Sequence, residues 1–89
     1  MSESGGSPTA APTAAAVLEH VVRSIVEEPD EVSIETRGGR RRVTLEVHVA
    51  PGEMGRVIGK RGRTAASIRT VVRAAATRDG VEVDVDFAD

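Results

Sequence analysis

The stretch VIGKRGR, residues 57–63, places two glycines around two cations between segments with helical patterns. Glycine has no Cβ and tolerates positive φ, so Gly59 and Gly62 allow a tight turn and a close approach of the backbone to a ligand. The helix that follows begins with unpaired N–H groups and the positive end of its dipole, which suits a phosphate. Lys60 and Arg61 add charge at the same place. The stretch therefore predicts two helices joined by a tight Gly-x-x-Gly turn, and this turn would face the backbone of a polyanion.

Charge is segregated along the chain, although the whole chain has a net charge of −2. Residues 37–78 carry eleven of the twelve cations and only two acids, so this segment has a net charge of +9. The remainder has one cation and twelve acids, a net charge of −11. Because the local field steers a polyanion, the segment is a better guide to partners than the whole chain. It indicates a nucleic-acid-facing region; the alternative is an arginine-rich solvated surface.

The composition excludes several classes of protein. The 89 residues allow one small domain, and the absence of cysteine excludes disulfides, thiol nucleophiles and thiolate zinc sites. No apolar run is long enough for a membrane span, and the N-terminus lacks the regions of a signal peptide, so we expect a cytoplasmic protein with no membrane partner. His20 and His48 have no carboxylate or cysteine partners at ligand spacing, and Thr64 and Ser67 have no base nearby in sequence. We therefore predict no metal, no cofactor, no small-molecule substrate and no enzymatic activity.

The N-terminal part divides into a tail and a helix. Residues 1–13 are mostly Ser, Gly, Pro, Thr and Ala, which predicts a disordered tail before a domain at 14–89. Thr13 is the expected cap of a first helix that runs to about Glu28 and stops at Pro29. Its apolar face is formed by residues at helical spacing, namely Leu18, Val21, Val22 and Ile25.

The remaining pattern predicts an α+β fold. Alternating apolar residues indicate strands at 32–35, 43–49 and 81–87, with helices at about 53–58 and 63–77 between the last two. The pair Gly38-Gly39 predicts a hairpin turn between the first two strands. The order α-β-β-α-α-β gives a three-stranded mixed sheet with three helices on one face. The opposite face is expected to be acidic and to repel RNA; its residues are Ser33, Glu35, Thr44, Glu46, His48, Glu82, Asp84 and Asp86.

At this point the chain resembles the KH domain in its type II, bacterial arrangement, over about residues 15–88. More narrowly, residues 49–65, VAPGEMGRVIGKRGRTA, are similar to the small single-domain bacterial RNA-binding proteins of the KhpA family. The resemblance implies that the loop Gly59-Lys60-Arg61-Gly62 clamps the backbone of about four single-stranded nucleotides. Many KH domains have a bulky aliphatic residue where this chain has Ala65, and Ile68 is the candidate to fill part of that space.

Further candidates surround the loop. Arg56, Arg63 and Arg69 are predicted to form a basic RNA-binding rim, with a solvated face or a subunit contact as an equal alternative for each. Ile58 is predicted to be mainly a core residue that exposes an edge as the floor of a base groove. Arg73 lies four residues after Arg69 on the same helix face, where a solvated surface or a subunit contact is an equal alternative. The cations of the hairpin turn either reach a phosphate or only solubilise the turn; they are Arg40, Arg41 and Arg42.

Other phosphate and RNA motifs do not fit. Gly55 and Gly59 are too close for a P-loop, and Lys60 is followed by Arg61 instead of Ser or Thr. The glycines do not follow a strand with the spacing of a dinucleotide-binding fingerprint. RRM and cold-shock domains stack bases on sheet aromatics, and this chain has a single aromatic residue, Phe87.

The sequence therefore predicts a non-enzymatic module that binds single-stranded RNA through residues 59–62. One such loop holds few nucleotides, so a second copy or a partner is expected. The resemblance implies a homodimer or a heterodimer with a KhpB/Jag-type KH protein, and a role as an RNA chaperone or post-transcriptional regulator. The alternative is a protein-interaction adaptor, a dimerisation module whose Gly-x-x-Gly loop is vestigial.

Overall fold

A computed structural model describes residues 10–88 of the chain, and the elements follow the predicted order. They are α1 (Pro12–Ile25), a 3₁₀ turn η1 (Pro29–Glu31), β1 (Ser33–Gly38), β2 (Arg42–His48), α2 (Met54–Ile58), a second 3₁₀ turn η2 (Lys60–Gly62), α3 (Arg63–Asp79) and β3 (Glu82–Phe87). The order is the predicted α-β-β-α-α-β arrangement of an α+β fold.

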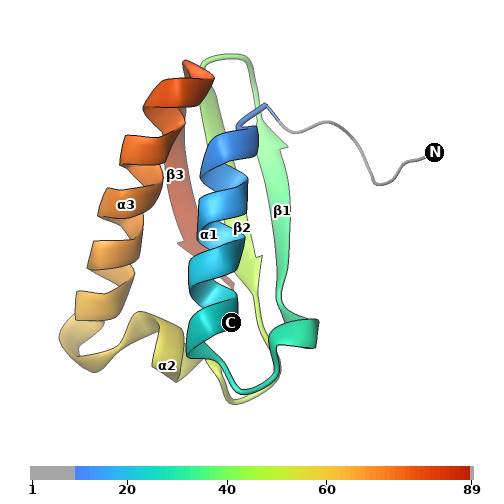
Figure 1. Cartoon of the computed structure of the whole chain (residues 1–89), viewed down its shortest axis with the longest axis vertical. Helices are drawn as coiled ribbons and strands as arrows, with labels where there is room; N and C mark the ends of the chain where they lie inside the picture. The colour runs from blue at the N-terminus through green and yellow to red at the C-terminus, as the bar shows by residue number, and fades with distance from the viewer. Residues whose placement is uncertain (1–9, 89) are drawn as a thin grey trace.

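The sheet has the order β1-β2-β3. β1 pairs with β2 in antiparallel register, and β3 returns parallel to β2. Helices α1 and α3 lie side by side across one face of the sheet, and α2 lies at the end where α3 begins (Figure 1). The β1–β2 hairpin lies at the other end, beside the C-terminus of α3 (Figure 1). We call these the loop end and the hairpin end of the domain.

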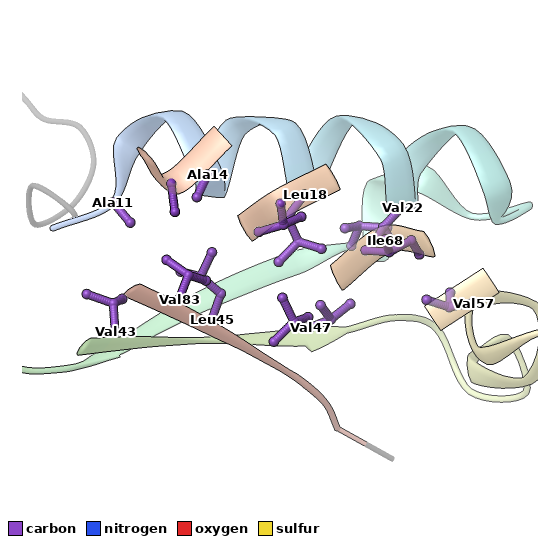
Figure 2. Close-up of a cluster of buried hydrophobic side chains, with 14 of the residues drawn as sticks. Ala11, Ala14, Leu18, Val22, Val43, Leu45, Val47, Val57, Ile68 and Val83 are labelled. Atoms are coloured by element: carbon purple, nitrogen blue, oxygen red, sulfur yellow. The ribbon is translucent and has the colours of Figure 1, made fainter. Parts of the chain in front are cut away.

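The core lies between the two long helices and the sheet (Figure 2). Leu18 and Val22 on α1 are spaced four residues apart, so both meet the sheet, where Leu45 and Val47 are fully buried. Ile68 and the other buried residues of α3 complete this apolar layer between the helices and the sheet. Among the described residues, the buried cluster contains no aromatic side chain, although Phe87 packs against it partly buried. The helical and strand members of the cluster are Ala14, Leu18, Val22, Val43, Leu45, Val47, Val57, Ile68, Val72, Ala76, Val83 and Val85.

The start of α1 differs from the prediction. The helix begins at Pro12, a favoured first helical residue, and Thr13 is not its cap. The cap comes from Asp79, whose carboxylate accepts hydrogen bonds from the Thr13 and Ala14 N–H groups at 3.1 and 2.9 Å. Ala11 is fully buried in the core, and α1 includes residues 12 and 13, whereas the sequence assigned all three residues to the tail. The tail predicted to be disordered spans residues 1–13, and residues 1–9 of it lie outside the described residues.

The end of α1 also comes earlier than predicted, at Ile25 instead of Glu28. Val26 is already extended, and the next two N–H groups donate to the buried carboxylate of Glu53, each at 2.8 Å. A side chain from the segment before α2 thus replaces the helical carbonyls as the acceptor for Glu27 and Glu28. Local sequence carries no signal for this because the acceptor is about 25 residues away.

The hairpin turn is shifted by two residues from the glycine pair. Gly38 still pairs with Val43, and the Gly39 N–H donates to the Arg42 carbonyl at 3.1 Å, so Arg40 and Arg41 form the tip. Of the two glycines in this turn, only Gly38 has positive φ, at 116°. A Cβ on Gly38 would lie 2.7 Å from the Arg42 carbonyl oxygen. The glycine therefore allows the close approach of the strands, while the tip presents two exposed arginines.

Candidate nucleic-acid interface

The Gly-x-x-Gly loop is one 3₁₀ turn between α2 and α3. The Gly59 N–H donates to the Gly55 carbonyl at 2.9 Å and closes α2, and the Gly62 N–H donates to the Gly59 carbonyl at 3.1 Å. Three of the four loop residues have positive φ: Gly59 at 76°, Arg61 at 59° and Gly62 at 72°. Positive φ at a non-glycine residue such as Arg61 is uncommon, and such residues are enriched at functional sites.

The two loop glycines, Gly59 and Gly62, are required for different structural reasons. Gly59 has φ 76° and ψ 175°, a region that is essentially closed to other residues. A Cβ on Gly59 would also lie 2.6 Å from the Thr64 Cβ, so the first turn of α3 packs directly on this residue. Gly62 has left-handed φ and ψ, but a Cβ there would meet open space. Gly59 is therefore required for packing as well as conformation, whereas Gly62 is required for conformation alone.

The charges at the loop are exposed and uncompensated. Lys60, Arg61 and Arg63 have no acidic partner within residues 10–88, and we call these three the loop cluster. The N-terminus of α3 has no side-chain cap and no acid in its first turn. The positive end of the helix dipole therefore adds to the three side-chain charges, as an anion site requires.

The other two predicted rim arginines are held by the protein itself. Arg56 lies 3.1 Å from a Glu27 oxygen and 3.6 Å from a Glu53 oxygen. Arg69 reaches the carbonyl oxygen of Val85 at 3.4 Å and lies 5.0 Å from the centroid of the Phe87 ring. Both sit near the loop end, but their guanidinium groups already have partners.

A groove of about 450 Å³ lies next to the loop. It is lined by Met54, Gly55, Ile58, Gly59 and Phe87. Ile58 is half-buried there, where the sequence placed the floor of a base groove, whereas Ala65 and Ile68 are buried and do not line it. The sequence did not assign Met54 and Phe87 to the groove, because alternation places Phe87 on the inner face of β3 without showing that the strand ends beside α2.

The open face of the sheet differs from the acidic surface that the sequence predicts. Arg37 pairs with Glu46 and Asp86 at 3.7 and 3.5 Å, and Arg42 pairs with Glu82 and Asp84 at 2.8 and 3.3 Å. Two arginines counted in the basic segment therefore neutralise acids on this face. The segment of net charge +9 is not one continuous basic surface.

His48 has neighbours that sequence spacing did not reveal. Its Nε2 lies 3.2 Å from a Glu46 oxygen and 3.9 Å from a Glu35 oxygen, because the strand register brings Glu35 opposite Glu46. The expectation that His48 lacks carboxylate neighbours is therefore wrong. Since Arg37 also contacts Glu46, these groups form part of the charge-paired sheet surface.

A Gly-x-x-Gly turn between two helices, in an α-β-β-α-α-β chain whose last strand runs parallel to the central one, defines a type II KH domain. The sequence profile described as "KhpA/KhpB, KH domain" matches residues 15–87. The chain belongs to this family.

Curated relatives support the assignment. The RNA-binding protein KhpA of Streptomyces coelicolor is 52% identical over 68 residues, which cover 76% of this chain and 85% of that protein. KhpA of Clostridium acetobutylicum is 46% identical over 71 residues, 80% of this chain and 95% of the relative. KhpA of Mycobacterium tuberculosis is 48% identical over 68 residues, 76% of this chain and 84% of the relative. No solved structure gave a significant match. Within the described residues, no helix is long and apolar enough to cross a membrane.

Proposed function

We propose that this chain is a non-enzymatic protein that binds single-stranded RNA at the Gly59–Gly62 loop. The observation that carries the proposal is the loop cluster: three exposed cations without acidic partners at the acid-free N-terminus of α3. Phosphates of the RNA would meet Lys60, Arg61 and Arg63, where backbone of positive φ lets the strand approach closely. The names of the curated relatives agree with this ligand class.

The groove beside the loop would receive the bases. Its side chains are apolar, those of Met54, Ile58 and Phe87, and Arg69 partly covers the Phe87 ring. Contacts of this kind pack against a base without reading its edge, so we expect weak sequence preference. Arg69 and Arg56 would contribute to the local field and would contact RNA only after leaving their present partners.

The proposal includes self-association and a cytoplasmic role as an RNA chaperone or post-transcriptional regulator. One loop of this size holds about four nucleotides, and a second copy or a KhpB/Jag-type KH protein would raise the effective affinity. Val71 supports a contact of this sort, because this large apolar side chain of α3 is 49% exposed. The same residue favours the second candidate function, an adaptor that binds protein and not RNA.

The test is the double substitution Lys60→Asp and Arg61→Asp, with binding of a fluorescent five-nucleotide single-stranded RNA measured by anisotropy. We expect the loss of at least two phosphate contacts, each of which contributes roughly −0.7 to the slope of log K against log salt. Arg23→Asp is the control, because Arg23 already has Glu19 and Asp30 as partners. Unchanged RNA binding by a folded double variant would reject the loop and favour the adaptor.

A further inference from the structure

The cations without partners fall into two groups at opposite ends of the domain. Six of the twelve cations contact acids or carbonyl oxygens: Arg23, Arg37, Arg42, Arg56, Arg69 and Arg73. Among residues 10–88, the other six have no such contact. Three form the loop cluster, and the other three are Arg40, Arg41 and Arg78, which we call the hairpin cluster.

Tertiary contacts bring together the segments that carry the hairpin cluster, namely the hairpin tip and the end of α3. The Glu82 N–H donates to the Arg41 carbonyl at 2.8 Å, which fixes the hairpin tip against the start of β3. A hollow of about 350 Å³ separates the tip from the end of α3 and is lined by Arg41, Thr77, Gly80, Val81 and Glu82. Arg78 is the residue after Thr77 and is exposed.

The nearby acids do not neutralise this cluster. Glu82 is held by Arg42 at 2.8 Å, and Asp84 lies between Arg42 and Arg73 at 3.3 and 3.8 Å. Asp79 is used by the N–H groups at the start of α1. The negative end of the α3 dipole accounts for a cation at Arg78, but it does not account for two arginines at a hairpin tip.

We propose that the hairpin cluster is a second phosphate-binding surface, and that it holds the same RNA strand that the loop clamps. This inference rests on the proposed function. The seam between α3 and β3 connects the two clusters, and Arg69 and Arg73 lie along it with their guanidinium groups at the Val85 and Val83 carbonyls. A strand that leaves the loop along this seam passes these cations and paired acids before it reaches Arg41.

The spacing of the clusters sets the length of RNA required. Helix α3 has 17 residues between them, about 25 Å at a rise of roughly 1.5 Å per residue. At the spacing of about 3.4 Å per nucleotide that a strand keeps in a stacked duplex, phosphates roughly seven nucleotides apart reach both clusters. A five-nucleotide RNA therefore contacts the loop alone, and a twelve-nucleotide RNA contacts both.

The experiment compares the wild-type chain with Arg40→Gln/Arg41→Gln on unstructured five- and twelve-nucleotide RNAs. Each phosphate contact contributes about 0.7 to the slope of log affinity against log salt. Two contacts therefore raise the affinity about 25-fold when the salt concentration falls from 1 M to 0.1 M. We expect the variant to bind the twelve-nucleotide RNA about 25-fold more weakly, with a slope lower by about 1.4, and the five-nucleotide RNA within twofold of wild type. The affinities of variant and wild type are compared on RNAs of the same length. The number of positions at which the protein can bind the RNA is then the same for both and cancels from the ratio.

Three outcomes would overturn the inference. Binding of the twelve-nucleotide RNA within twofold of wild type would mean that these arginines only solubilise the turn or face an acidic protein. Equal weakening of both RNAs would mean a general effect of charge, which Arg23→Gln measures by removing one cation that already has partners. Two five-nucleotide RNAs bound per wild-type chain would mean that the second cluster takes a separate strand. If neither RNA binds the wild-type chain, the proposed function itself fails.

Discussion

The loop end and the hairpin end of this domain carry the same number of unpaired cations, but the backbone that presents these cations differs between the two ends. Each end has three cations without acidic partners among the described residues. Each also has a carboxylate that accepts two N–H groups, from the start of α1 at the hairpin end and from the segment just after α1 at the loop end. At the loop end the backbone has three residues with positive φ and an uncapped N-terminus of α3. At the hairpin end the available helix N-terminus, that of α1, is already occupied by Asp79.

This difference separates a site built from backbone from one built from side chains. A phosphate at the loop end can use N–H groups and a helix dipole that are fixed before binding, so less conformational entropy is lost. A phosphate at the hairpin end has flexible arginine side chains alone. We therefore expect the loop end to supply most of the affinity, and the hairpin end to add a salt-sensitive contribution for longer RNA.

The largest expected effect tests the backbone of the loop end. Gly59→Ala should lower the free energy of unfolding by about 3 kcal/mol, because the new Cβ meets the Thr64 Cβ and the backbone lies in a glycine-only region. Gly62→Ala should cost about 1 kcal/mol, since it adds only left-handed strain. Urea unfolding of the two variants measures both effects. Equal losses at the two positions would contradict the separate tasks assigned to the glycines.

Much of this fold could be predicted from local pattern. The period of the apolar residues gives the order of helices and strands, and the Gly-x-x-Gly turn with its cations identifies the loop. These features follow from neighbours a few residues apart. The sequence also gives the sheet face of Glu35 and Glu46 correctly, because side chains alternate along a strand.

Apart from the shifted hairpin turn, the main features that were not predicted depend on distant partners. Asp79 follows a helix and precedes a glycine, so its sequence context indicates a turn, yet it caps a helix about 65 residues earlier. Arg37 and Arg42 count as free charge until the register places acids beside them. Net charge along the chain consequently overstated the basic surface and could not show that the free cations form two clusters.

The second prediction concerns the carboxylate at the loop end. Glu53 is 7% exposed and accepts the Glu27 and Glu28 N–H groups at 2.8 Å each. Glu53→Gln leaves one of these buried donors facing an amide NH₂ group, so the free energy of unfolding should fall by about 2 kcal/mol. Denaturant unfolding measures the loss. Arg56→Gln is the control, since Arg56 is an exposed partner of Glu53 and its removal should cost less than about 1 kcal/mol.

The smallest expected effect concerns Asp79, the carboxylate at the hairpin end. Its contribution is measured from the way the stability of the fold changes with pH. Burial acts to raise the pKa of Asp79, but the hydrogen bonds from the Ala14 and Thr13 N–H groups and from the Thr13 hydroxyl together outweigh it and hold the pKa below its ordinary value. A carboxyl group with a lowered pKa stabilises the fold above the pKa of the unfolded chain, about 3.9, and this contribution is lost as the pH falls through the lower pKa of the folded state.

Asp79→Asn should therefore be less stable than the wild type at pH 7, by less than Glu53→Gln, because Asp79 is the more exposed of the two carboxylates. The difference between wild type and Asp79→Asn should shrink as the pH falls below about 4, since protonation removes the same charge from the wild type. Thermal unfolding from pH 7 to pH 2.5 measures the difference at each pH. A gap that stays constant over this range would mean that Asp79 acts by shape and not by charge. Closure of the gap at low pH would show that the start of α1 is held at the hairpin end by a carboxylate, which leaves Arg40, Arg41 and Arg78 to meet any further anion there.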